Sequence, residues 1–252
     1  MKILKGKLLT ATLLLGAITL SGFANAGFVA LDWKTDGDNR ATLDESTGIE
    51  WLKLSETKNL SINEVKGLLD TTYAGWRLPT EAEVEQFLVN ALPTFPFDGV
   101  SKAYSSSTYK SYTDTWRSYM STVTFRSTSA INQYYDYWMS YGLYEASDAS
   151  VDMTGTYLRR YRTNNKTYWL ANIYDGQESV NYNADYSGAD LGVFLVGDGG
   201  ATLTTQNDLS LTANNANSPY NATKDVPEPA GILLLASGLF GLAMVRRNKK
   251  AK

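Results

Sequence analysis

The 252-residue chain contains no cysteine and no histidine. Their absence excludes Ser-His-Asp and Cys-His nucleophilic sites, tetrahedral Cys/His zinc sites, and haem or iron–sulfur centres ligated by those residues. Disulfide bonds are excluded as well, so any folded domain must be held together by its core alone. The net charge of -3 and an isoelectric point of about 5.1 give no basic footprint for nucleic acid. Carboxylate chemistry, oxygen-ligated metals and binding without catalysis remain.

Residues 1–26 have the pattern of a secretory signal peptide. Three lysines within the first seven residues precede an apolar run at 8–20, and Ala24-Asn25-Ala26 provides the small-x-small pattern that signal peptidase accepts. The apolar run of 13 residues is short for a membrane span, which needs about 20. We therefore predict cleavage after Ala26, with Ala24 and Ala26 as the recognised positions.

The end of the chain, residues 226–252, has three parts in a fixed order. Pro227-Glu228-Pro229 comes first, an uncharged run of 16 residues follows at 230–245, and a tail that begins with Arg246 and Arg247 carries five positive charges in its seven residues. Sixteen helical residues span about 24 Å, which is close to the thickness of a hydrocarbon core. The basic tail favours the cytoplasmic side. The pattern predicts one C-terminal transmembrane helix, with the preceding chain outside the cell.

This arrangement, together with the signal peptide, resembles the PEP-CTERM sorting signal of Gram-negative bacteria. The resemblance covers about the last 26 residues. It implies recognition by an exosortase-type transpeptidase, cleavage near Pro227-Glu228-Pro229, and a mature protein without the helix. The alternative is an ordinary single-pass membrane anchor. Cleavage at both ends leaves residues 27–226, which keep 25 of the acidic residues and 15 of the basic ones, a net charge of -10.

Residues 27–200 have the pattern of a single α+β domain. Capping boxes at Ser61–Glu64 and Thr80–Glu83 predict two helices in the N-terminal half. Short alternating segments predict a mostly antiparallel sheet, with strands near 28–31, 41–43, 122–125, 168–174 and 191–196. Residues 201–225 are rich in Asn, Thr and Ser and poor in apolar residues. That composition predicts an extended stalk between the domain and the membrane.

The segment Trp76-Arg77-Leu78-Pro79-Thr80 predicts a strand-to-helix corner. Pro79 fixes the chain just before Thr80, the expected N-cap of the second helix. Trp76 and Leu78 alternate toward one side, which suits insertion beneath that helix. Arg77 is expected to bind carbonyl groups or a carboxylate, with Glu50 and Asp44 as the candidates. We interpret the segment as an organiser of the core rather than as a ligand site.

This segment and the upstream Thr47-Gly48-Ile49-Glu50-Trp51 resemble a family of exported bacterial domains that carry Thr-Gly-Leu-x-Trp and Gly-Trp-Arg-Leu-Pro-Thr. The family is similar to the C-terminal domain of bacterial collagen-like adhesins and is linked to the C-type-lectin-like fold. The resemblance covers about residues 30–198. It implies a lectin-like α+β domain with binding or adhesion among its relatives, and no catalytic residues.

An aromatic stretch provides the candidate ligand surface. Tyr134, Tyr135, Tyr137 and Trp138 offer the rings and hydroxyl groups that bind sugars by stacking and hydrogen bonding. An aromatic core or a cross-strand ladder is the alternative. Nearby, Arg159-Arg160-Tyr161-Arg162 has the charge to bind an acidic polysaccharide, with pairing to local carboxylates as the alternative.

Asp36 and Asp38 are a candidate for a calcium site, because carboxylates are preferred ligands of Ca²⁺. The spacing departs from the EF-hand loop, and a solvated hairpin turn is the alternative. No other cofactor is indicated.

Together these features predict a non-catalytic protein of the cell surface or the extracellular (biofilm) matrix. Its partners would be signal peptidase, an exosortase-type transpeptidase, and an exopolysaccharide or another matrix component, but not nucleic acid. A self-associating structural coat protein is the first alternative. A carboxylate-dependent polysaccharide hydrolase is the second, although no spacing selects a pair of acids.

Overall fold

The computed structural model describes residues 27–95, 102–104, 107–130, 133–163, 166–178 and 182–224. The predicted signal peptide with Ala24 and Ala26, and the C-terminal sorting signal at 226–252, lie outside these residues. Within the described ranges, no helix is both long and apolar enough to cross a membrane.

A small antiparallel sheet forms the N-terminal part of the fold. Its strand order is β1-β2-β3-β10, with β1 at Phe28–Leu31, β2 at Ala41–Asp44, β3 at Ile49–Leu52 and β10 at Val196–Gly197. The strands expected near 28–31 and 41–43 are both present. Every residue of β2 and β3 is buried, so this sheet is covered on both faces.

A second, larger sheet is built from later segments. Its order is β4-β8-β7-β6-β5, with β4 at Lys102–Tyr104, β5 at Thr124–Ala130, β6 at Gln133–Glu145, β7 at Val151–Thr163 and β8 at Lys166–Glu178. These strands pair antiparallel, and β9 (Leu191–Val193) adds a parallel pairing to β6. The architecture is therefore α+β and mostly antiparallel, with two sheets instead of the one expected.

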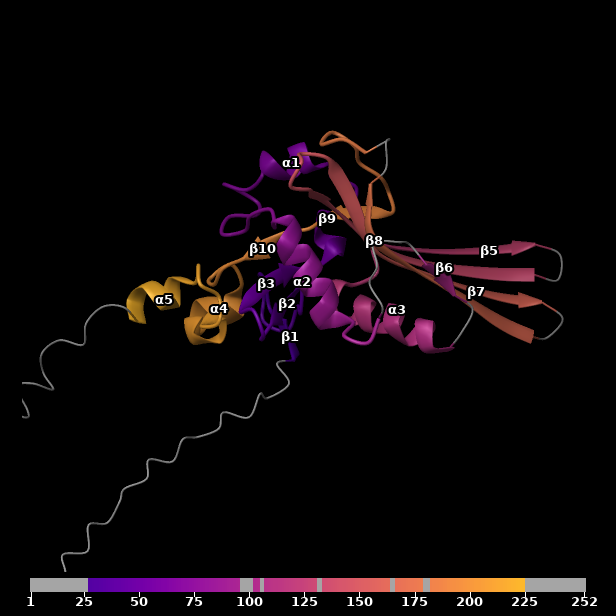
Figure 1. The fold of residues 1–252 in the computed structure, drawn as a ribbon, viewed down its shortest axis with the longest axis horizontal. Helices are drawn as coiled ribbons and strands as arrows, with labels where there is room; N and C mark the ends of the chain where they lie inside the picture. Colours follow the sequence, from indigo (N-terminus) through magenta and orange to yellow (C-terminus); the bar gives the residue numbers. More distant parts are fainter. Residues whose placement is uncertain are drawn as a thin grey trace, which may run out of the picture.

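The outer part of the larger sheet extends beyond the rest of the molecule (Figure 1). We call it the arm: β5, residues 133–139 of β6, 157–163 of β7 and 166–172 of β8, which are paired in register across all four strands. Long paired strands account for the projection, since β6, β7 and β8 each contain 13 residues.

Both predicted capping boxes are confirmed. Ser61 caps α1 (Ile62–Lys66) and exchanges hydrogen bonds with Glu64, and Thr80 caps α2 (Glu81–Ala91) in the same way with Glu83. The short 3₁₀ helix η1 (Leu54–Thr57) lies between β3 and α1.

A further helix, α3 at Ser107–Met120, was not predicted from the sequence. Its residues Tyr109, Tyr112, Trp116 and Met120 recur at helical spacing, and Trp116 and Met120 are fully buried. The Trp116 indole donates a hydrogen bond to the Ser140 hydroxyl group on β6 (3.0 Å), which fixes α3 against the larger sheet.

Two apolar clusters lie on opposite faces of the strands. Trp51 of β3 and Tyr144 of β6 belong to the cluster around α2 and α3. Their neighbours in the same strands, Leu52 and Leu143, belong to the other cluster. Alternate residues of a strand point to opposite faces, so both sheets are buried on two sides near the centre of the molecule.

Residues 201–224 differ from the predicted stalk. They form α4 (Leu203–Asn207), η2 (Leu209–Thr212) and α5 (Pro219–Lys224), which lie at the opposite end of the molecule from the arm (Figure 1). Thr202 and Thr205 are fully buried, and their hydroxyl groups donate to the Glu50 carboxylate at 2.6 and 2.5 Å. The prediction was wrong here because small polar side chains form internal hydrogen bonds instead of facing water.

Candidate functional site

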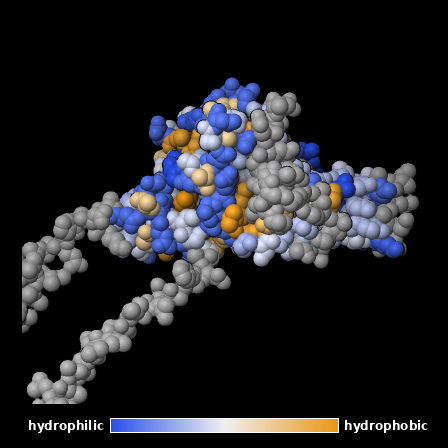
Figure 2. Space-filling view, viewed as in Figure 1, coloured by the Kyte–Doolittle hydropathy of each residue, from blue (hydrophilic) through white to orange (hydrophobic). Residues whose placement is uncertain are grey.

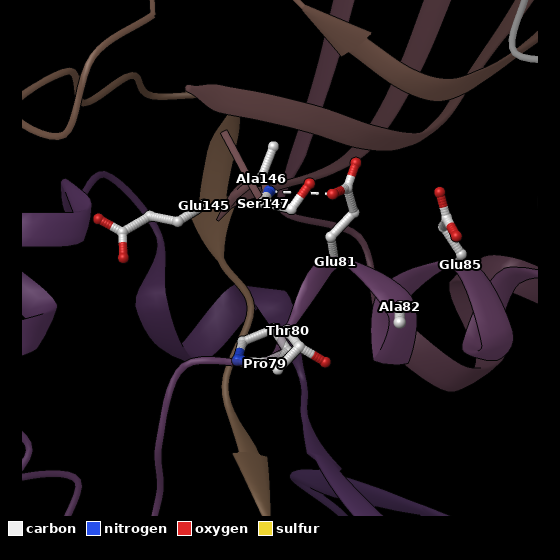
Figure 3. Close-up of a pocket in the computed structure, with 8 residues that line it drawn as sticks. All are labelled: Pro79, Thr80, Glu81, Ala82, Glu85, Glu145, Ala146 and Ser147. Atoms are coloured by element: carbon white, nitrogen blue, oxygen red, sulfur yellow. Dashed lines mark hydrogen bonds between the residues drawn. The ribbon is translucent and has the colours of Figure 1, made fainter. Parts of the chain in front are cut away.

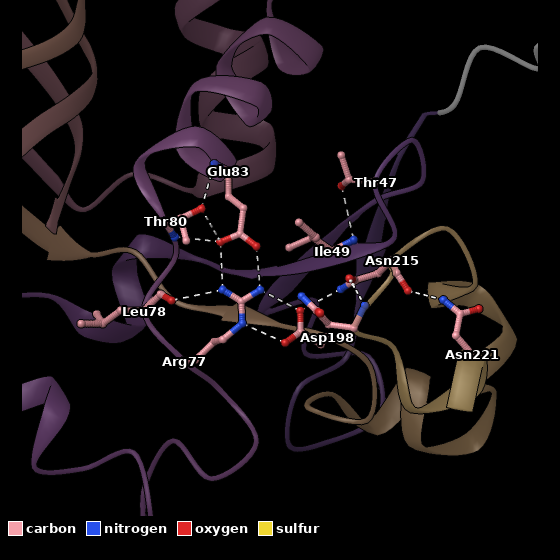
Figure 4. Close-up of polar contacts among 10 residues, drawn as sticks. Thr47, Ile49, Arg77, Leu78, Thr80, Glu83, Asp198, Asn215 and Asn221 are labelled. Atoms are coloured by element: carbon pink, nitrogen blue, oxygen red, sulfur yellow. Dashed lines mark hydrogen bonds and ion pairs between the residues drawn. The ribbon is translucent and has the colours of Figure 1, made fainter. Parts of the chain in front are cut away.

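The Trp-Arg-Leu-Pro-Thr corner, residues 76–80, joins the two halves of the chain. The backbone of Arg77 exchanges two hydrogen bonds with Val196 of β10, at 2.8 and 2.9 Å. Its guanidinium group binds the carboxylate of Glu83 on α2 and that of Asp198, which follows β10 (Figure 4). The expected partners, Glu50 and Asp44, were wrong: Glu50 accepts from residues 201–205, and Asp44 from Ser46 and Asn90.

All five N–H donors of Arg77 are used within the protein. Nε and Nη2 bind Asp198, Nη1 and Nη2 bind Glu83, and the second hydrogen on Nη1 points to the carbonyl oxygen of Leu78. Hydrogen bonds from Arg77 lower the pKa of Asp198. Burial acts to raise the pKa of Glu83, but the hydrogen bonds that Glu83 accepts from Arg77 and Thr80 outweigh burial, and the pKa of Glu83 is lowered as well. No donor of Arg77 is free for a ligand, so we interpret this corner as structural.

The two tryptophans of the motif lie in different clusters. Trp51 is buried beneath α2 with its ring centroid 4.3 Å from that of Phe87. Trp76 was expected under the same helix but belongs to the other cluster, where it meets Trp33 edge-on at 6.2 Å. Leu78 is half-buried against that cluster too. Trp51, not Trp76, therefore supports α2.

The calcium candidate at Asp36 and Asp38 lies in a turn that is held by hydrogen bonds from the backbone. The Asp38 carboxylate accepts hydrogen bonds from the backbone N–H groups of Trp33, Lys34, Thr35 and Arg40. Burial opposes the effect of these bonds, but together they lower the pKa of Asp38 to about 2. Because its oxygens are occupied by backbone donors, Asp38 acts as an anchor of the β1–β2 connection. Among the described residues, no group of three or more acidic side chains is placed to hold a metal ion. Asp36 therefore belongs to no such group.

An acidic pocket of about 630 Å³ lies at the N-terminal end of α2 (Figure 3). Glu81 accepts a hydrogen bond from the backbone of Ser147 (2.9 Å), and Glu145 forms an ion pair with Lys66 (2.6 Å). In Figure 3, Glu145 points away from Glu81 and Glu85. The carboxylates of this pocket therefore do not converge on a common point.

The predicted aromatic surface is divided between the two faces of the arm. Tyr135 and Tyr137 of β6 point to one face, and Tyr134 and Trp138 point to the other, since neighbouring residues of a strand alternate. Three of the four rings pack on aromatic rings of the neighbouring strands, as in the cross-strand ladder that was the alternative interpretation: Tyr135 on Tyr161, Tyr137 on Tyr157, and Trp138 on Phe125.

The first face carries an unbroken group of tyrosines. We call it the tyrosine face and define it by its central side chains: Tyr135, Tyr137, Tyr157, Arg159, Tyr161 and Tyr168. Tyr161 is stacked on Tyr168 with ring centroids 4.7 Å apart and on Tyr135 at 6.1 Å, and Tyr137 lies 6.1 Å from Tyr157. These rings are half-buried or exposed. Over the part of the arm seen in Figure 2, hydrophilic colours predominate, as expected for Tyr, Ser, Thr and Arg.

The opposite face is built on tryptophan and charge. Trp138 is stacked on Trp169 at 6.1 Å, and the Arg160 guanidinium lies within 6 Å of both rings. Arg160 also forms an ion pair with Asp136. From α3, Arg117 lies over Trp138 and Lys110 over Trp169, so the helix covers the inner part of this face.

A pocket of about 490 Å³ continues the tyrosine face toward the body of the protein. Tyr141 and Tyr174 line it from the sheet and Tyr182 and Tyr186 from the following loop, and Arg126 is paired with Asp190 beside them (2.7 Å). Burial raises the pKa of Tyr141 and of Tyr182 above the usual range. The phenol groups of Tyr141 and Tyr182 are therefore neutral hydrogen-bonding groups at physiological pH.

Sequence reasoning named four of the six residues of the tyrosine face, but in two separate candidates: Tyr135 and Tyr137 in the aromatic stretch, and Arg159 and Tyr161 in the basic one. Tyr157 and Tyr168 were missed, although odd-numbered positions of β7 and even-numbered positions of β8 show the alternation that places them together. The information lacking was the register between strands, which pairs Tyr135 with Tyr161 and Tyr161 with Tyr168.

Comparison with known proteins and protein families identifies the C-terminal segment of the chain. No curated protein and no solved structure was found to match the chain, so the resemblance to lectin-like domains depends only on the residues quoted above. Residues 225–248 match the model of the PEP-CTERM protein-sorting motif, a stretch that includes Pro227, Glu228, Pro229, Arg246 and Arg247. The chain is thus an exported protein with a C-terminal membrane-anchored sorting signal, of the type that an exosortase processes.

Proposed function

We propose that this protein is a component of the cell surface or extracellular matrix whose folded domain binds a polysaccharide along the tyrosine face, without catalysis. The single observation that carries the proposal is the continuous group of tyrosine rings on one face of a projecting arm. The sorting motif supports the location, because it directs the chain out of the cytoplasm. The binding role agrees with what the resemblance to lectin-like domains implies.

The chemistry of the tyrosine face suits sugar rings. A phenol ring offers an apolar surface to the C–H groups of a sugar and a hydroxyl group to its oxygens, and it loses little conformational freedom on binding. The ring of Tyr168 is 40% exposed, and the adjacent ring of Tyr161 is half-buried, so the face is accessible yet already ordered by stacking. A preordered face reduces the entropy lost on binding.

The residues of the tyrosine face also support a role without catalysis. Glycoside hydrolysis requires two carboxylates on either side of the scissile bond. The register places no aspartate or glutamate on this face in the described part of the arm. Asp136, the one acidic residue within the arm strands as described, points to the opposite face, where it is paired with Arg160.

A self-associating coat protein is the second candidate, and one observation favours it. The outer side of β5 pairs with no other described strand, and its Phe125 is 55% exposed. Unpaired edge strands are templates for pairing with another chain.

The test uses the mature protein isolated from its host and the exopolysaccharide of the same cells, in affinity electrophoresis. Tyr161→Ala and Tyr137→Ala are expected to weaken retardation by the polysaccharide about ten-fold, since stacked rings are hot spots of binding. Tyr134→Ala is the matched control, because this exposed tyrosine is on β6, like Tyr137, but lies on the opposite face of the arm. Unchanged melting temperatures show that the variants are folded.

Equal binding by all three variants would refute the tyrosine face as the site. Light scattering separates the second candidate, since a coat protein assembles with increasing concentration and is insensitive to added sugar. Assembly that Phe125→Ala abolishes, without any retardation by polysaccharide, would favour the coat protein over the binding module.

A further inference from the structure

Arg159 occupies the centre of the tyrosine face. Tyr157 and Tyr161 flank it on β7, and the register places Tyr137 of β6 and Leu170 of β8 directly opposite it. Its guanidinium carbon lies 5.7 Å from the centroid of the Tyr161 ring. The described strand neighbours of this cation are therefore aromatic and aliphatic, and none of them is a carboxylate.

The guanidinium group of Arg159 is incompletely paired. Its Nε is buried and has no hydrogen-bond partner, and it forms no ion pair with any residue that the structure describes. The next residue, Arg160, points to the opposite face and is paired with Asp136, while Arg77 uses all five of its donors. A buried donor without a partner is costly and calls for an explanation such as a missing ligand.

A second unpaired atom lies beside it. The side-chain oxygen of Asn172 is buried without a hydrogen-bond partner, and Asn172 stands opposite Tyr157, one position diagonal to Arg159 on the same face. Its amide nitrogen is bonded to the Tyr174 hydroxyl group (3.3 Å), so the oxygen is the free end. An unpaired donor and an unpaired acceptor thus lie together among the tyrosine rings.

The charge of this face is opposite to that of the protein. Residues 27–226 have a net charge of -10, which repels anions in general. The tyrosine side of the arm carries Arg126, Arg159 and Lys166 and, within the described strands, no acidic residue. Of these, Arg126 is already paired with Asp190, so Arg159 is the cation available at the centre.

We infer that the ligand of the tyrosine face is an acidic polysaccharide, with Arg159 binding its carboxylate or sulfate group. This inference rests on the proposed binding function and names the class of its ligand. The planar guanidinium group binds carboxylate and sulfate-like oxyanions through parallel N–H donors. Tyr137 and Tyr161 stack on the sugar rings at either side, and the half-buried Asn172 offers its amide group to a sugar hydroxyl group.

The test compares three polymers with the mature protein isolated from its host: polygalacturonate, which carries carboxylates, dextran sulfate, and neutral dextran. Affinity electrophoresis at physiological ionic strength is expected to show retardation by an acidic polymer and none by dextran. Arg159→Gln should weaken that retardation at least ten-fold. Arg162→Gln is the matched control, because Arg162 is exposed on the opposite face of the same strand and its loss removes the same charge. It should change retardation less than two-fold.

The outcomes separate this inference from the proposed function. Equal weakening by Arg159→Gln and Arg162→Gln would overturn the specific role of Arg159, since only net charge would then matter. If Tyr161→Ala abolishes binding and Arg159→Gln leaves it unchanged, the glycan role stands and the acidic ligand is refuted. Retardation by one acidic polymer and not the other identifies the anionic group, whereas the absence of retardation by every polymer, including the host exopolysaccharide, refutes both. Unchanged melting temperatures confirm that each variant is folded.

Discussion

The guanidinium group of Arg77 binds both carboxylate oxygens of Asp198, which lies 121 residues further along the chain, with Nε 2.8 Å from Oδ2 and Nη2 2.7 Å from Oδ1. The same group binds both oxygens of Glu83, the residue that closes the capping box of α2. One side chain therefore joins the start of a helix to the segment that follows the last strand. This arrangement makes Arg77 a tie between distant parts of the chain.

Loss of this tie should destabilise the domain. Arg77→Ala leaves two half-buried carboxylates facing each other without their cation, and we expect the free energy of unfolding in urea to fall by about 2 kcal/mol. The matched control is Arg40→Ala, because Arg40 forms a single ion pair with Glu56 and is 49% exposed. That change should cost less than about 0.5 kcal/mol. Equal costs would show that Arg77 contributes no more than a surface charge.

The same cluster predicts a dependence of stability on pH. Glu83 and Asp198 have a lowered pKa in the folded protein, so the unfolded chain binds more protons than the folded one as the medium becomes acidic. Their contribution is fully present above their unfolded pKa values of about 4 and is lost as pH falls through the lower folded values. Urea titrations from pH 6 to pH 3 should therefore show a steeper loss of stability in the wild type than in Arg77→Ala. Parallel curves would contradict the assignment, because the other acidic residues are common to both proteins.

The sequence predicted local structure better than long-range contacts. The capping boxes at Ser61 and Thr80 were confirmed because their signal lies within four residues. The predicted partners of Arg77 were wrong because Asp198 comes close to Arg77 only when β10 pairs with β3. Helix α3 was missed because its Thr and Tyr residues favour strands, and burial of Trp116 and Met120 outweighs that preference.

The aromatic surface shows the same division. The four aromatic residues at 134, 135, 137 and 138 were predicted as one surface because they are close in sequence. The alternation of side chains along β6 places Tyr135 and Tyr137 on one face and Tyr134 and Trp138 on the other. Arg159 and Arg160 were one basic cluster in sequence, yet one lies among tyrosines and the other beside Asp136. A candidate surface read along one strand is therefore incomplete until the neighbouring strands are placed.

Glu50 provides the test of the folded segment 201–224. Its fully buried carboxylate accepts four hydrogen bonds, from the backbone N–H groups of Ala201 and Thr202 and the hydroxyl groups of Thr202 and Thr205. In Glu50→Gln the NH₂ group of the new side chain faces the backbone N–H of Ala201. Both groups are hydrogen-bond donors, so this hydrogen bond is lost. We expect a loss of about 1–3 kcal/mol in the free energy of unfolding, with faster proteolysis within 201–224.

The matched control for Glu50 is Glu45→Gln. Glu45 is an exposed glutamate that accepts from the backbone of Gly27, so the same chemical change should alter stability by less than about 0.5 kcal/mol. Faster proteolysis in both variants, or in neither, would show that residues 201–224 are not held by Glu50.

The sorting motif predicts a processing step that mass spectrometry measures directly. Replacement of Pro227, Glu228 and Pro229 by alanine should leave a membrane-bound precursor, because recognition by the exosortase-type enzyme requires the motif within residues 225–248. The wild-type protein from the surface and medium should have a mass that lacks both ends, near Gly27 to Val226. Asn217→Ala, outside the matched residues, is the control and should be processed normally. If the alanine variant is released with the wild-type mass, another enzyme cleaves the chain. If the wild-type protein keeps its C-terminal residues, the tail is a permanent anchor and the matrix location loses its main support.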